Sequence, residues 1–105
     1  MSIYIPALRC IGNILTVSDA AVVDRCLWLG AMDSLTQMLY QSNSTIIKES
    51  LWAVSNITAG PVSHVEKFIE SPLLERIMFL TENRNIDNRR EALFCLCNAI
   101  TGADV

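Results

Sequence analysis

The stretch Ser50-Leu51-Trp52-Ala53-Val54-Ser55-Asn56-Ile57 decides the fold, because two variants of it occur elsewhere in the chain without gaps. The asparagines of the three segments lie 43 and then 42 residues apart. A period of this length is typical of repeats that contain two or three helices and stack into a solenoid. The other two segments are Ala7-Leu8-Arg9-Cys10-Ile11-Gly12-Asn13-Ile14 and Ala92-Leu93-Phe94-Cys95-Leu96-Cys97-Asn98-Ala99.

Every element is predicted to be a helix, because apolar residues recur at intervals of three and four and strict alternation never persists. The predicted helices cover residues 4–16, 19–29, 32–42, 45–59, 62–70, 73–83 and 88–101. Residues that favour helix ends and helix starts separate them. These residues are Gly30, Asn43-Ser44, Gly60-Pro61, Ser71-Pro72 and Asp87.

The helices predict an all-α, right-handed solenoid of about two and a third repeats. We expect residues 1–16 to form the last helix of one repeat, residues 17–59 a complete repeat, and residues 60–105 the following repeat. Both ends are apolar and lack the polar cap of a terminal repeat, so we expect a piece of a longer array that self-associates through its ends. The apolar end residues are Ile3, Ile5, Leu8, Ile11 and Ile14 in the first helix and Leu93, Leu96 and Ile100 in the last.

The composition argues against several classes of function. A net charge of −3 without a clustered run of Lys and Arg disfavours nucleic-acid binding. No apolar run reaches the roughly 18 residues that span a bilayer, and no signal peptide begins the chain. We therefore predict no membrane association and a cytoplasmic and nuclear location. There, the cysteines are expected to be buried free thiols that hold neither metal nor cofactor, at Cys10, Cys26, Cys95 and Cys97.

The repeated segment also carries a candidate binding face. Glu49, Trp52 and Asn56 are spaced i, i+3 and i+7, which places them on one side of a helix. Leu51, Val54 and Thr58 fall on the opposite side and are predicted to be core. Stacked repeats would place the equivalent faces side by side, with Arg9/Asn13 and Phe94/Asn98 flanking Trp52/Asn56.

These residue types suit an extended basic peptide. An Asn amide both donates and accepts hydrogen bonds, so it can pair with a peptide main chain of any sequence. An aromatic face attracts a Lys or Arg cation, typically by about 0.5–2 kcal/mol. Glu49 and Glu91 can add charge-assisted hydrogen bonds.

Other interpretations stay open at this point. A Trp at helical spacing is more often core, and the asparagines could instead make structural hydrogen bonds to neighbouring repeats. The surface could also bind a folded protein as a scaffold, without preference for basic peptides. An enzyme is the weakest alternative, because His64, the single histidine, is expected to be solvated and no catalytic constellation accompanies it.

The segment from Lys48 to Gly60 resembles the third-helix signature of the importin-alpha (karyopherin-alpha) family, which recognises nuclear localisation signals. Residues 6–16 resemble the family's repeat in which Arg replaces the groove Trp, and residues 90–100 resemble the repeat that follows. The resemblance implies an armadillo-repeat adaptor and places the chain at the C-terminal part of the groove, the minor signal-binding site. Phe94 departs from the family's Trp and should hold a basic side chain less tightly.

By this resemblance, the contact residues bind Lys- and Arg-rich segments of cargo proteins. Ser55 would lie beside the trough, Arg9 would interrupt the aromatic array, and Asp19 is a weaker acidic candidate near the rim. The full set of predicted peptide-binding residues is Arg9, Asn13, Glu49, Trp52, Ser55, Asn56, Glu91, Phe94 and Asn98.

Overall fold

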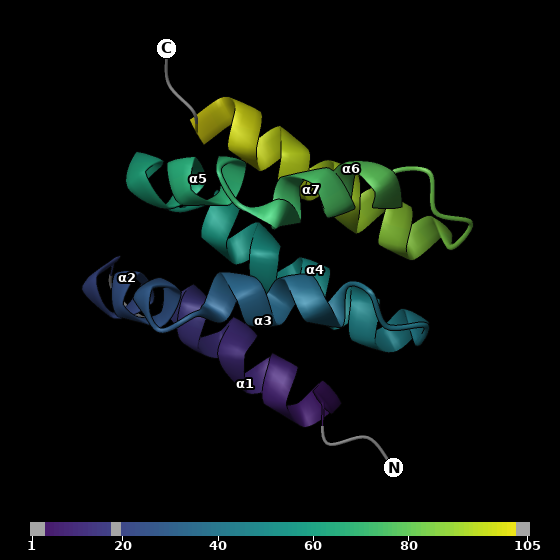
Figure 1. Ribbon diagram of the computed structural model, residues 1–105, viewed down its shortest axis with the longest axis horizontal. Helices are drawn as coiled ribbons and strands as arrows, with labels where there is room; N and C mark the ends of the chain where they lie inside the picture. Colours follow the sequence, from purple (N-terminus) through teal and green to yellow (C-terminus); the bar gives the residue numbers. More distant parts are fainter. Residues whose placement is uncertain (1–3, 18–19, 103–105) are drawn as a thin grey trace.

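The computed structural model describes residues 4–17 and 20–102, and all elements in this part of the chain are helices. Their order along the chain is shown in Figure 1. They are α1 (Tyr4–Val17), α2 (Ala20–Trp28), α3 (Ala31–Met38), α4 (Ser44–Thr58), α5 (Val62–Ile69), α6 (Pro72–Leu80) and α7 (Ile86–Gly102). The prediction of an all-helical solenoid is therefore confirmed.

Several helix boundaries follow from the capping residues that the sequence predicts. The Asn43 side chain accepts hydrogen bonds from the backbone N–H groups of Thr45 and Ile46, at 2.8 and 3.2 Å, and so starts α4. Ser71 caps α6 in the same way, with Pro72 at the first helical position. Gly30 separates α2 from α3 with a φ of 102°, a left-handed conformation that glycine adopts without steric cost.

Two predicted boundary residues act differently. The last helix begins at Ile86, because the Asn85 side chain accepts a hydrogen bond from Asn88 N–H at 3.1 Å, while Asp87 lies within the first turn. Gly60 follows α4 as predicted, but it does not adopt a left-handed φ. Among the described residues, Gly30 is the glycine that does so. α3 and α6 also end four and three residues before their predicted limits, at Met38 and Leu80.

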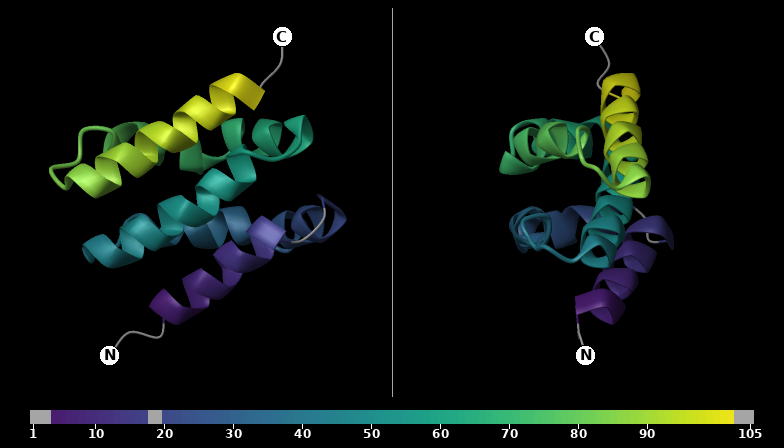
Figure 2. Two further views of the ribbon diagram at one scale, coloured as in Figure 1. Left: turned by 180° about the vertical axis from the view of Figure 1, so that it is seen from behind. Right: turned by 90° about the vertical axis from the view of Figure 1, so that its right-hand side faces the viewer.

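The helices form two layers. α1, α4 and α7 lie side by side in one layer, and α2, α3, α5 and α6 form the other, as the right-hand view of Figure 2 shows. The core lies between the layers, with fully buried side chains from both, including Leu51, Val54, Phe68, Leu73 and Ile77. Leu51, Val54 and Thr58 are 0–1% exposed, so the predicted core face of α4 is confirmed.

Two hydrogen bonds join α7 to the preceding long helix, α4. Asn88 donates its side-chain N–H to the carbonyl oxygen of Ser44 at 3.3 Å, and the Cys95 thiol donates to the carbonyl oxygen of Leu51 at 3.2 Å. Both bonds span 44 residues, which is about one repeat. They fix the relative positions of α4 and α7.

The second layer has its own connections between repeats. Lys67 Nζ on α5 lies 2.8 Å from a carboxylate oxygen of Asp24 on α2. Arg76 on α6 donates to the carbonyl oxygen of Leu39 at 3.1 Å. We propose that the repeats divide as residues 1–16, 17–59 and 60–105, so that α2–α4 and α5–α7 are equivalent sets of three helices.

One histidine prediction is wrong. His64 is 2% exposed rather than solvated, and its Nε2 lies 3.6 Å from Asp24. The amphipathic pattern of α5 explains this burial, because His64 is followed at i+1 and i+4 by the core residues Val65 and Phe68.

Candidate functional site

A pocket of about 260 Å³ lies across the layer of long helices. Its walls come from three helices that are distant in sequence, α1, α4 and α7. Residues that line it are Arg9, Asn13, Lys48, Glu49, Trp52 and Glu91. Five of these six were predicted to share one face, so the predicted alignment of the three helices is present in the structure.

Trp52 is partly buried and lies against the neighbouring helix. A Cβ atom built on Gly12 of α1 would collide with the indole ring, so the absence of a side chain at Gly12 gives the ring its place. The ring is therefore neither a core side chain nor fully exposed. It forms one wall of the pocket, and its position is set by packing between repeats.

The pocket contains charges of both signs. Arg9 Nε donates to Glu49 Oε1 at 3.0 Å, across 40 residues of sequence. The Glu49 side chain is 15% exposed and that of Arg9 is 60% exposed. Lys48 and Glu91 complete the lining, so the two cations and two carboxylates cancel in formal charge.

The asparagines bridge neighbouring helices. Asn56 Nδ2 donates to the carbonyl oxygen of Gly12 at 3.2 Å, and Asn98 Nδ2 donates to the carbonyl oxygen of Ser55 at 3.3 Å. Asn56 and Asn98 thus make structural hydrogen bonds to neighbouring repeats, the alternative that the sequence left open. Because an amide group carries two donor hydrogens and an acceptor oxygen, one such bond does not exhaust its capacity.

Asn13, at the equivalent position of α1, is exposed and lines the pocket. Asn56 and Asn98 are partly buried. The three asparagines occupy equivalent positions of α1, α4 and α7, and Asn13 is the one that lines the pocket.

The remaining predicted residues lie in different surroundings. Ser55 is 3% exposed and its hydroxyl donates to the carbonyl oxygen of Trp52 at 2.6 Å, so its predicted place beside an open trough is wrong. Phe94 is 55% exposed on α7, outside the pocket lining. Asp19 lies outside the described residues.

Sequence reasoning did not select two residues that shape this site. Lys48 lies four residues before Trp52, a spacing that places both on one helix face, and could have been found from this signal. Gly12 takes the position of Ser55 and Cys97 in the other segments. Its importance depends on how two helices face each other, which a single helical pattern does not reveal.

The cysteines only partly match the prediction of buried thiols. Cys95 is buried, and burial together with the nearby charge of Glu91 raises the pKa of its thiol to about 12, so the thiol stays neutral. Cys10 and Cys97 are exposed and Cys26 is partly buried, which corrects the prediction. Within the described residues no cluster of three or more acidic, Cys or His side chains could hold a metal ion.

The fold places the chain in one class of protein, the α-solenoids built of armadillo repeats. Residues 24–59 match the family described as Armadillo/beta-catenin-like repeat. Solved structures agree: an engineered protein has a TM-score of 0.87 at 24% identity, over 95% of this chain and 41% of that one. A designed armadillo repeat protein in complex with the peptide (KR)4 has a TM-score of 0.82 at 24% identity, over 93% and 44% of the two chains.

Curated relatives point to one branch of this class. Importin subunit alpha-2 of Oryza sativa subsp. japonica is 34% identical over 104 residues, which cover 93% of this chain and 20% of that protein. Importin subunit alpha-1a of the same species is 38% identical over 76 residues, covering 70% and 14%. The chain is an importin-alpha-like set of armadillo repeats, and it spans about a fifth or less of the length of these relatives. No helix in the described ranges is long and apolar enough to cross a bilayer.

Proposed function

We propose that the pocket and the row of asparagines bind an extended, basic peptide, and that the chain acts as a non-catalytic adaptor. The observation that carries this proposal is that Glu91 of α7 lines the same pocket as Glu49 and Trp52 of α4, although it comes from the following repeat. An aromatic face beside carboxylates is suited to the aliphatic stem and charged tip of a Lys or Arg.

The asparagines would hold the main chain of the peptide. Asn13 is exposed, and Asn98, two repeats further along the same layer, is partly buried. Amides spaced in this way can pair with successive N–H and C=O groups of an extended chain, whatever its side chains. Specificity for basic residues would then come from the pocket.

The length of such a ligand matches the molecule. A fully extended peptide of eight residues, the length of (KR)4, spans at most about 26–29 Å. The longest dimensions of the protein are 35 and 28 Å. The armadillo fold is compatible with a ligand of this kind, since the designed armadillo repeat protein of the same fold was solved with (KR)4.

The similarity to importin alpha subunits extends the proposal to the biological role. We propose that the peptide is a nuclear localisation signal of a cargo protein and that the chain works in the cytoplasm and nucleus. The 34% and 38% identities support this assignment. Self-association through the apolar ends belongs to the proposal as well, because Ile14 and Ile100 at the two ends are 42% and 76% exposed.

Calorimetric titration with the (KR)4 peptide tests the proposal through Glu91→Gln. This change keeps the shape of the side chain and removes its charge from the pocket. We expect the affinity to fall roughly three- to tenfold, the equivalent of about 0.7–1.4 kcal/mol. Glu75→Gln, on α6 in the other layer, is the matched control and should bind like the wild type.

A peptide of the same length that alternates Asp and Glu should show no binding to the wild type. Equal (KR)4 affinity of the wild type and Glu91→Gln would remove the basic-peptide proposal. It would favour a scaffold that binds another folded protein.

A further inference from the structure

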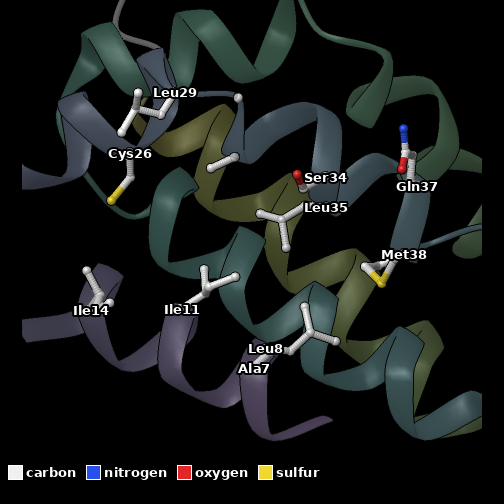
Figure 3. A pocket seen from close by; sticks show the side chains of 12 residues that line it. Ala7, Leu8, Ile11, Ile14, Cys26, Leu29, Ser34, Leu35, Gln37 and Met38 are labelled. Atoms are coloured by element: carbon white, nitrogen blue, oxygen red, sulfur yellow. The ribbon is translucent and has the colours of Figure 1, made fainter. Parts of the chain in front are cut away.

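Two cavities of the protein differ in charge. A larger one, of about 420 Å³, lies between α1 and the α2–α3 pair, and Figure 3 shows the side chains that line it. Apart from Ser34 and Gln37 its residues are apolar or glycine, and none of them is charged. The smaller pocket at Trp52 is lined by two cations and two carboxylates. The charges that can select a ligand therefore lie in the smaller pocket.

Two of these four charges already neutralise each other. Arg9 Nε on α1 donates to Glu49 Oε1 on α4 at 3.0 Å. The pair satisfies one cation and one carboxylate of the pocket. The other two charges are those of Lys48 on α4 and Glu91 on α7.

Lys48 and Glu91 have no partner of opposite charge in the part of the chain that the structure describes. Neither side chain forms an ion pair or a hydrogen bond with a residue there. A charged side chain on a helix can pair with one that lies three or four residues away. No residue at that spacing from Lys48 is acidic, and none at that spacing from Glu91 is basic. The pocket thus offers a ligand one ammonium group and one carboxylate.

A ligand with only cationic side chains uses half of this arrangement. Its Lys or Arg can pair with Glu91, but a further cation in the same pocket meets the like charge of Lys48. Like charges that face each other across an interface lower affinity, whereas complementary charges give specificity. One charge of each sign is therefore complementary to a ligand that presents both signs.

An extended peptide can present both signs to one pocket. Its side chains point alternately to opposite sides, so those of residues i and i+2 share a side and lie about 6.6–6.8 Å apart. The pocket is shared by α1, α4 and α7, and packed helices lie about 8–10 Å from each neighbour. Two side chains on the same side of the peptide therefore fit within this pocket.

We propose that the ligand of this pocket is a peptide of mixed charge, with a basic and an acidic residue two positions apart, and that Lys48 binds the acidic one. The inference rests on the proposed function and narrows its ligand class. The basic side chain pairs with Glu91 beside the Trp52 ring, and the carboxylate accepts a charge-assisted hydrogen bond from the Lys48 ammonium group. Lys48 is thus a specificity residue of the peptide site.

Two peptides of identical composition, both with blocked termini, test this ligand class by calorimetric titration. In (KKEE)2 the side chains i and i+2 carry opposite charges, whereas in (KE)4 they carry the same charge. The wild type should bind (KKEE)2 roughly three- to fivefold more tightly than (KE)4. Lys48→Met keeps the aliphatic stem without its charge and should bind the two peptides equally. It should also bind (KR)4 about twofold more tightly, because a like charge has been removed.

Arg84→Gln is the matched control, because it removes the same formal charge from the exposed loop between α6 and α7, outside the pocket. It should prefer (KKEE)2 as the wild type does. A preference that Arg84→Gln also loses would arise from net charge and would overturn the inference.

Equal affinity of the wild type for (KKEE)2 and (KE)4, or a preference that persists in Lys48→Met, would also overturn it. In both cases, binding of (KR)4 by the wild type leaves the proposed basic-peptide function in place. If the wild type does not bind (KR)4, the proposed function itself fails, and this inference fails with it.

Discussion

Trp52 has its place in the pocket because Gly12 on the neighbouring helix has no side chain. The indole ring occupies the space that a Cβ on Gly12 would need. The same residue accepts a hydrogen bond from Asn56 through its carbonyl oxygen. A single glycine on α1 thus positions both the aromatic and the amide side chain that α4 contributes.

Gly12→Ala is expected to weaken peptide binding and to change stability only moderately. Alanine gains about 1 kcal/mol of helix propensity over glycine, and forced overpacking typically costs 1–3 kcal/mol. The free energy of unfolding should therefore fall by at most about 2 kcal/mol, while the displaced ring lowers the (KR)4 affinity several-fold. Denaturant unfolding and calorimetric titration measure the two effects, with Cys10→Ala on the same helix as control. Unchanged affinity would show that the position of Trp52 does not matter for the ligand.

Arg9 is expected to compete with the basic ligand for Glu49. Its guanidinium already lies 3.0 Å from the carboxylate that an incoming Lys or Arg would use. Arg9→Gln should therefore raise the (KR)4 affinity roughly two- to fivefold at low salt, and the gain should shrink at high salt. Arg25→Gln on α2 is the control, since Arg25 lies 5.0 Å from the Trp28 ring, away from the pocket. Weaker binding by Arg9→Gln would instead make Arg9 a direct contact of the peptide.

At the scale of elements, helix type and order could be predicted from the sequence, because apolar spacing and caps act locally. Asn43 and Ser71 begin α4 and α6 as expected. The errors arise where two capping residues compete, as at Asn85 and Asp87. His64 was expected to be solvated, although its place beside the core residues Val65 and Phe68 of the amphipathic α5 indicates burial.

The contact between α2 and α5 is expected to depend on pH. The hydrogen bond and charge of Lys67, with a smaller contribution from His64, lower the pKa of Asp24 below its ordinary value of 3.8. A carboxyl group whose pKa is lower in the folded state stabilises the fold above its unfolded pKa, and this stabilisation is lost as the pH falls through the folded pKa. Thermal unfolding of wild type and Asp24→Asn should thus differ at pH 6 and converge as the pH falls below about 3.8.

The size of this difference should be small, because the pair is at the surface. Lys48→Met, a change of another exposed lysine outside this pair, should leave the pH dependence as in the wild type. A difference between wild type and Asp24→Asn that persists undiminished at pH 2.5 would contradict the assignment to the Asp24–Lys67 pair.

At the scale of the whole molecule, the repeat period predicts which residues meet. Spacing of 42–43 residues brings Arg9, Glu49 and Glu91 to one pocket, since equivalent faces of stacked helices lie side by side. The period does not give the rotation of each helix against its neighbour. Ser55 was therefore expected beside the trough, although it is buried and accepts a hydrogen bond from Asn98 through its carbonyl oxygen.

The two tryptophans allow the most direct test of the proposed peptide site. Trp52 lines the pocket, while Trp28 is 73% exposed on α2, in the other layer of helices. Their indole N–H groups give two separate signals in a two-dimensional ¹H–¹⁵N spectrum, and Trp28→Phe assigns them. Titration of the wild type with (KR)4 should shift the Trp52 signal in a saturable manner and leave that of Trp28 in place. A Trp52 signal that stays unmoved, or equal shifts of both signals, would contradict a basic-peptide site between α1, α4 and α7.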